Sequence, residues 1–121
     1  MTNIYRRITE HQVDECDNGV RIQAVVPIEG DQAPNQYWLS YDRASTCLSF
    51  QDGVVPEVGT NGITEEALLV VLADRLRCFQ EGRFACEENA IALICVERAL
   101  KALHQRTLNR QARGVEGTCK P

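Results

Sequence analysis

The feature that most constrains the fold is a run of 28 residues, from Cys86 to Arg113, that contains neither proline nor glycine. Two glutamates lie near its start, where the helix dipole favours acidic side chains, and Gly114 follows it as a fitting C-terminal stop. An earlier helix is expected from Thr64, a good N-cap residue, to about Gln80. The short "GRFA" link between the two predicts an antiparallel helical hairpin.

The first sixty residues have the composition of β-strands. Four segments rich in branched and aromatic residues alternate with turn signals, and the connections are too short for crossover helices. The segments are "NIYRRITE", "VRIQAVV", "QYWLSYD" and "TCLSFQDGVV", and the turn signals are "DNG", "GDQAPN" and "QDG". We therefore predict an α+β fold: an antiparallel sheet of about four strands, then a two-helix hairpin. Residues 1–121 are expected to form one domain, with a sheet part (1–60) and a hairpin part (61–121).

Two features of the hairpin predict a homo-oligomer. Each helix has a block that is apolar on every side, "ALLVVLA" (67–73) and "AIALICV" (90–96), whereas a surface helix of a small monomer shows one apolar stripe. The second helix should span about 42 Å and the first about 25 Å, which leaves roughly ten residues without a partner in the hairpin. A second subunit would cover both surfaces, although the sheet could cover part of them.

The charge of the chain is unevenly distributed. The net charge is −4, yet residues 98–113 contain five basic residues and no acidic one. Residues 1–60 carry four basic and nine acidic groups, and residues 61–121 carry nine basic and eight acidic. General DNA or RNA binding needs a wider basic surface than this. A compact anionic ligand does not.

Three arginines of this basic segment share one helix face. With about 100° per residue, Arg110 and Arg113 fall within about 40° of Arg106, and Ala99 and Ala102 lie on the same face one or two turns earlier. Guanidinium groups stack on planar rings and also bind phosphate in a forked geometry, so this stripe suits a nucleotide. The alternative is a solvated stripe that the helix dipole favours by about 0.3–1 kcal/mol per cation.

No motif of an enzyme or of a metal site competes with this interpretation. The sequence lacks a P-loop, GxGxxG, HExxH and CxxC, so we expect no catalytic residues, no cofactor and no metal. Cys78 and Cys95 are expected to be small core residues in a reducing compartment. No apolar run reaches 18 residues and the N-terminus lacks a secretory h-region, which predicts a cytoplasmic protein without a membrane partner.

Four pieces of the second half, "NGITEEALL", "FACEENA", "RT" and "RGVEGT", carry a family resemblance. Over about residues 50–118 the chain resembles phage proteins of the anti-Thoeris type one family, whose hairpin is shared with anti-CBASS type two sponges. The resemblance implies a protein that binds cyclic ADP-ribose signals made by bacterial TIR enzymes, and in some members cyclic di- or trinucleotides. It also implies a dimer or hexamer in the host cytoplasm, with the ligand between protomers.

The resemblance implies a first pocket of three residues. Phe79 would offer a flat face to adenine, Asn89 would bond a base edge or a ribose hydroxyl, and Arg106 would stack on adenine and reach the pyrophosphate. Each has a simpler alternative: Phe79 could close the end of a helix, Asn89 could cap the first turn, and Arg106 could be solvated.

A second ligand site is also implied by the resemblance. Arg110 and Arg113 would bind cyclic oligonucleotides near a symmetry axis. The strand residue that completes the first pocket has no match, and Arg21 and Arg43 are its candidates.

Three functions remain open on the sequence. The leading hypothesis is a sponge that sequesters the signal without cleaving it. The others are an enzyme that degrades the same nucleotide and a protein–protein adaptor that uses the apolar helices.

Overall fold

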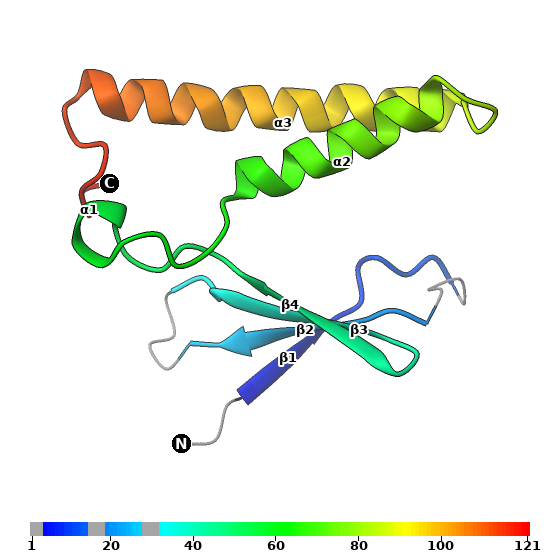
Figure 1. The fold of residues 1–121 in the computed structure, drawn as a ribbon, viewed down its shortest axis with the longest axis horizontal. Coiled ribbons are helices and arrows are strands. Elements are labelled where there is room, and N and C mark those ends of the chain that lie inside the picture. Colours follow the sequence, from blue (N-terminus) through cyan, green and yellow to red (C-terminus); the bar gives the residue numbers. More distant parts are fainter. Residues whose placement is uncertain (1–3, 15–18, 28–31) are drawn as a thin grey trace. The chain divides into compact units, whose positions relative to one another are not determined.

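The structure is a computed structural model, and it describes residues 4–14, 19–27 and 32–121. The chain divides into two compact units, Met1–Asp52 and Gly53–Pro121, the first formed by strands and the second by helices (Figure 1). The α+β class is therefore confirmed, whereas the single domain stays a prediction. Cys16 and parts of the expected turns "DNG" and "GDQAPN" lie outside the described residues.

Four antiparallel strands form the sheet, as the sequence predicts. They lie in chain order: β1 (Ile4–Ile8), β2 (Arg21–Val26), β3 (Gln36–Tyr41) and β4 (Ala44–Ser49). The register places Ala24 between Arg6 and Tyr37, and Ala24 is fully buried. The ring of Tyr37 meets the ring of Phe50 edge to face, with 5.8 Å between centroids.

The fourth strand is shorter than the sequence predicts. We expected it to continue through Val55, but β4 ends at Ser49 and α1 (Val55–Val58) forms one helical turn. Pro56 explains the difference, because its fixed φ suits the first turn of a helix and it cannot donate to a strand ladder. The turn between β3 and β4 was also unexpected, since it has no glycine; Asp42 takes a left-handed φ of 50° there, which aspartate tolerates.

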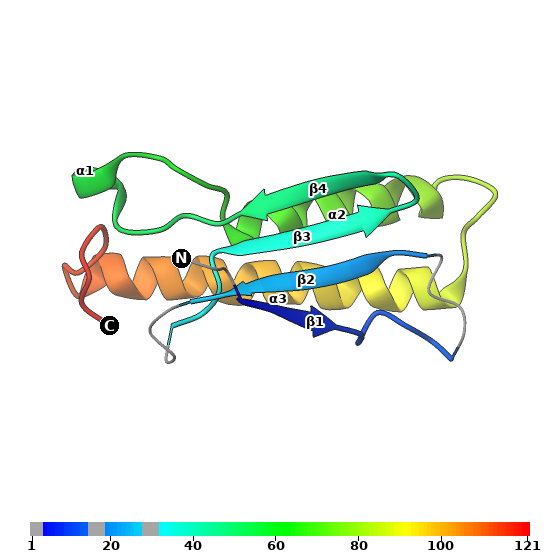
Figure 2. The same ribbon diagram turned by 90° about the horizontal axis from the view of Figure 1, so that it is seen from below.

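The helical hairpin is confirmed. Helices α2 (Glu65–Gln80) and α3 (Glu87–Ala112) lie side by side in both views (Figures 1 and 2). The Thr64 hydroxyl accepts a hydrogen bond from the Ala67 N–H at 3.1 Å, as expected of an N-cap. Gly114 ends α3 with a φ of 72°, the left-handed conformation common after a helix.

The hairpin has a thin core when one chain stands alone. Among the described residues, only Ala24 in the sheet and Ala73 in α2 are buried. Both apolar blocks are partly uncovered, with Val71 61% and Ile91 54% exposed. Cys78 and Cys95, which we expected in the core, are exposed as well, because α2 and α3 cover only the faces they turn toward each other. The oligomer stays a prediction.

The far end of α3 has more support from its own chain than expected. We predicted that roughly ten residues there would lack a partner in the hairpin, and α3 has 26 residues against 16 in α2. The tail, residues 115–121, folds back onto this end through bonds to Arg110 and Arg113 (Figure 1). The tail also runs beside α1: a Cβ at Gly117 would lie 3.5 Å from the Pro56 ring. None of the helices in the described ranges combines the length and apolar character needed to cross a membrane.

Candidate functional site

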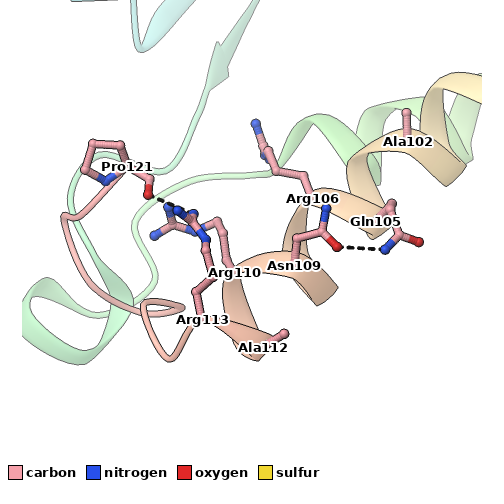
Figure 3. A pocket seen from close by; sticks show the side chains of 8 residues that line it. All are labelled: Ala102, Gln105, Arg106, Asn109, Arg110, Ala112, Arg113 and Pro121. Carbon is pink, nitrogen blue, oxygen red and sulfur yellow. Dashed lines mark hydrogen bonds between the residues drawn. The ribbon is translucent and has the colours of Figure 1, made fainter.

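The last turns of α3 form a groove lined by the predicted arginine stripe. We call it the arginine groove (Figure 3); its volume is about 740 Å³, and its lining comprises Ala102, Gln105, Arg106, Asn109, Arg110, Ala112, Arg113 and Pro121. The three arginines do share a face with Ala102, as the helical periodicity predicts, while Ala99 is not part of the lining. Gln105 donates a hydrogen bond to Asn109 at 2.8 Å along the same face.

Arg110 is the most engaged of the three arginines. Its guanidinium donates to the carboxylate of Glu116 at 3.1 Å and to the main-chain oxygens of Val115 at 3.0 Å and Thr118 at 3.1 Å. A further bond of 2.6 Å reaches the main-chain oxygen of Lys120. The side chain is only 20% exposed. In this conformation Arg110 therefore fixes the tail, with most of its donors occupied.

Arg113 and Arg106 differ from Arg110 in their partners. Arg113 makes one bond to the tail, to the main-chain oxygen of Pro121 at 2.8 Å (Figure 3). Arg106 is 60% exposed and faces a single carboxylate oxygen of Glu66 at 3.6 Å, an ion pair too long for a hydrogen bond. That Glu66 oxygen is buried and accepts no hydrogen bond. Among the three arginines of the stripe, Arg106 therefore has the guanidinium that is most available to a ligand.

The opposite end of the hairpin, which we call the turn end, holds Phe79 and Asn89. The Phe79 ring meets the Phe84 ring edge to face at 6.3 Å, and the guanidinium of Arg75 lies 5.0 Å from its centroid. The guanidinium of Arg83 lies 4.8 Å from the Phe84 centroid. Phe79 is thus part of a cluster of two rings and two cations.

Asn89 is half-buried. Its side-chain amide donates to the main-chain oxygen of Phe84 at 3.3 Å, and its own N–H donates to the sulfur of Cys86 at 3.4 Å. Within this chain Asn89 therefore bonds residues at the start of its own helix, as expected if its role is to cap the first turn. Its carbonyl oxygen has no hydrogen bond among the described residues, which leaves an acceptor for a base amino group or a ribose hydroxyl.

The structure does not bring the three predicted pocket residues together within one chain. Asn89 and Arg106 lie near opposite ends of α3, about 25 Å apart at a rise of about 1.5 Å per residue. Phe79 stands with Asn89 at the turn end. A ligand of nucleotide size that contacts all three must therefore lie between two chains.

Arg21 and Arg43 belong to the other compact unit. Arg21 begins β2, Arg43 lies in the turn between β3 and β4, and both are exposed. Their part in a pocket stays a prediction, as do the ligand roles of the five hairpin residues.

Sequence reasoning missed Arg75, Arg83 and Phe84. Arg75 precedes Phe79 by four residues on α2, a spacing that places two side chains on the same helix face, so this pair could have been found. The bonds of Arg110 to main-chain oxygens of the tail could not have been predicted, because main-chain acceptors leave no pattern in the sequence. The described residues contain no group of three His, Cys, Asp or Glu side chains suited to a metal ion.

Comparison with known proteins supports the resemblance seen in the sequence. A family model described as "Acb2/Tad1, hairpin domain" matches residues 48–108. Over 71 residues the chain is 46% identical to "Thoeris anti-defense 1" of Bacillus phage SBSphiJ7. This alignment covers 59% of the chain and 50% of the relative, so the chain matches about half the length of that protein.

Proposed function

Because the chain belongs to the family of the Acb2/Tad1 hairpin domain, we propose that it counters a bacterial Thoeris defence by binding the defence signal without cleaving it. The relative named "Thoeris anti-defense 1" supports the anti-defence part of this proposal. The ligand would be a cyclic ADP-ribose isomer, and the protein would act in the cytoplasm of the phage's host. A second site would take cyclic di- or trinucleotides.

The observation that carries the proposal is the arginine groove on the family's hairpin. Arg106 offers a guanidinium that is 60% exposed, next to the small side chain of Ala102. A planar base can lie on such a surface while the guanidinium stacks on the base or binds phosphate. The acidic balance of the chain, at net −4, disfavours bulk nucleic acid, so the local cations favour a small anion.

The first pocket would form between two copies of the chain. One copy would supply Phe79 and Asn89, and the other would supply Arg106, because these groups lie too far apart within one hairpin. The uncovered apolar blocks support such an assembly: Val70, Val71, Ile91 and Ile94 are each at least half exposed in the single chain. Apolar patches of this kind mark protein interfaces. A dimer, or a hexamer of three dimers, would bury them.

The experiment that tests the proposal is a release assay. The purified protein is incubated with a panel of cyclic ADP-ribose isomers and cyclic oligonucleotides, washed and heat-denatured, and the released compounds are identified by mass spectrometry. We expect an intact cyclic ADP-ribose isomer. The Arg106→Ala variant serves as the matched control that should retain much less of this compound.

Two other outcomes would each favour another function. A linearised or hydrolysed product would indicate the degrading enzyme. Retention of no nucleotide, together with a chain that is monomeric until a protein partner is added, would indicate the adaptor.

A further inference from the structure

Two arginines at the turn end have no carboxylate partner in the helical unit. Within residues 53–121, no carboxylate lies within 4.0 Å of the guanidinium nitrogens of Arg75 or Arg83. Three other arginines of the same unit, Arg77, Arg106 and Arg110, each have a glutamate partner. Neither guanidinium is therefore held in a direct ion pair within this unit, although Glu81, Glu87 and Glu88 belong to the same turn segment.

Both guanidinium groups are held over phenylalanine rings. They lie 5.0 Å and 4.8 Å from the ring centroids of Phe79 and Phe84, within the range of a cation–π interaction. A guanidinium that lies on a ring keeps its N–H groups directed outward, where they can bind phosphate oxygens. Phe84 also offers stacking surface, since it is 60% exposed.

The segment that carries these groups is braced by hydrogen bonds. The Gln80 side chain bonds both main-chain groups of Cys86, accepting from its N–H at 3.0 Å and donating to its carbonyl at 3.1 Å. The main chain of Phe84 is bonded by Asn89, and the N–H of Ala85 donates to the carbonyl of Gly82 at 3.2 Å. A binding surface fixed before the ligand arrives loses less entropy on binding.

We propose that Arg75 and Arg83 bind the phosphate groups of a nucleotide whose base stacks on the phenylalanines of the turn end. The inference rests on the proposed function and extends it. A pyrophosphate carries a negative charge on each phosphate, and Arg106 of a second copy supplies only one cation. Arg110 is occupied by the tail. Arg75 and Arg83 supply the missing positive charge from the same chain as Phe79 and Asn89.

The test is titration calorimetry with cyclic ADP-ribose at low and high sodium chloride concentration. The variants are Arg75→Gln and Arg83→Gln. The matched control is Arg98→Gln, which removes the same charge from an exposed position of α3. We expect the affinity to fall roughly tenfold or more in each turn-end variant, as for a lost charge-assisted hydrogen bond. The salt dependence of binding should weaken in parallel, and the control should change neither quantity.

The possible failures are distinguishable. If wild-type protein binds and both turn-end variants bind like Arg98→Gln, the inference is wrong and the proposed function stands. A lower affinity with an unchanged salt dependence would also overturn it, because the arginines would then only support the rings. If wild-type protein binds no cyclic nucleotide, the proposed function and the inference both fail. Should Arg75→Gln unfold, Arg83→Gln decides, since Arg83 lies in the turn outside both helices.

Discussion

The two ends of the α2–α3 hairpin carry positive charge in different ways. At the turn end, Arg75 and Arg83 lie on aromatic rings, and no carboxylate of residues 53–121 pairs with them. At the far end, Arg106 and Arg110 each face a glutamate, and Arg110 and Arg113 also bond the tail. The bonded arginines organise the chain, whereas the unpaired ones leave charge available to a ligand. Arg106, loosely paired and well exposed, falls between these two classes.

The partners of an arginine, and not its spacing in the sequence, distinguish an arginine that stabilises the chain from one that is available to a ligand. Arg106 and Arg110 are four residues apart on one face, yet their exposed fractions are 60% and 20%. Substitutions at the two positions should therefore affect different properties of the protein.

The largest effect is expected for Arg106→Ala. Loss of a guanidinium that pairs with a desolvated pyrophosphate should cost roughly 3 kcal/mol of binding free energy, about a hundredfold or more in Kd. Titration calorimetry with cyclic ADP-ribose measures it. The thermal midpoint should change little because the ion pair with Glu66 is 3.6 Å long and the Arg106 side chain is 60% exposed. An unchanged Kd would remove Arg106 from the pocket.

Phe79→Ala should have the next largest effect on the same ligand. Loss of base–aromatic stacking costs about 1–3 kcal/mol. Phe84→Ala is the informative comparison, since its ring touches Phe79 edge to face and is itself exposed. If both variants bind like wild type in calorimetry, the base does not stack at the turn end.

Arg110→Ala should act mainly on the tail. Its bonds to residues 115–120 are lost, which should destabilise the tail by about 1–3 kcal/mol and leave the cyclic ADP-ribose affinity nearly unchanged. Hydrogen exchange of the tail amides reports the first effect. The family resemblance adds that binding of a cyclic trinucleotide should weaken. Equal losses for Arg106→Ala and Arg110→Ala with every ligand would indicate one diffuse basic patch.

The smallest effect is expected for Glu66→Gln. The substitution removes the charge that faces Arg106 at 3.6 Å, and an ion pair of this length to a cation that is 60% exposed is worth about 0–1 kcal/mol. We expect a change of less than about threefold in Kd and a small shift of the thermal midpoint. A large loss of affinity would mean that Glu66 orients Arg106 for the ligand.

The sequence allowed the hairpin to be predicted because its signals are local. The hydroxyl of Thr64 and the flexible backbone of Gly114 mark helix ends through contacts within a few residues. The helical turn at Val55–Val58 was missed, since branched residues on both sides of Pro56 also suit a strand.

The site was only partly predictable for a different reason. Helical periodicity placed Arg106, Arg110 and Arg113 on one face, but it could not separate an available cation from an occupied one. That distinction depends on main-chain oxygens of the tail, such as those of Val115 and Thr118, which every residue possesses. Exposure of Cys78 was also missed, because an apolar helical pattern does not reveal how many neighbours cover it.

The central claim, that one pocket needs the turn end of one chain and Arg106 of another, is tested most directly by complementation. Phe79→Ala and Arg106→Ala chains are co-expressed with different tags, and assemblies carrying both tags are purified. In a two-fold dimer, one pocket then combines the intact Phe79 and Asn89 with the intact Arg106, while the other loses both partners. We expect cyclic ADP-ribose to bind such mixed dimers with wild-type affinity at about half the wild-type stoichiometry. Mixed assemblies that bind no better than either variant alone would contradict the account.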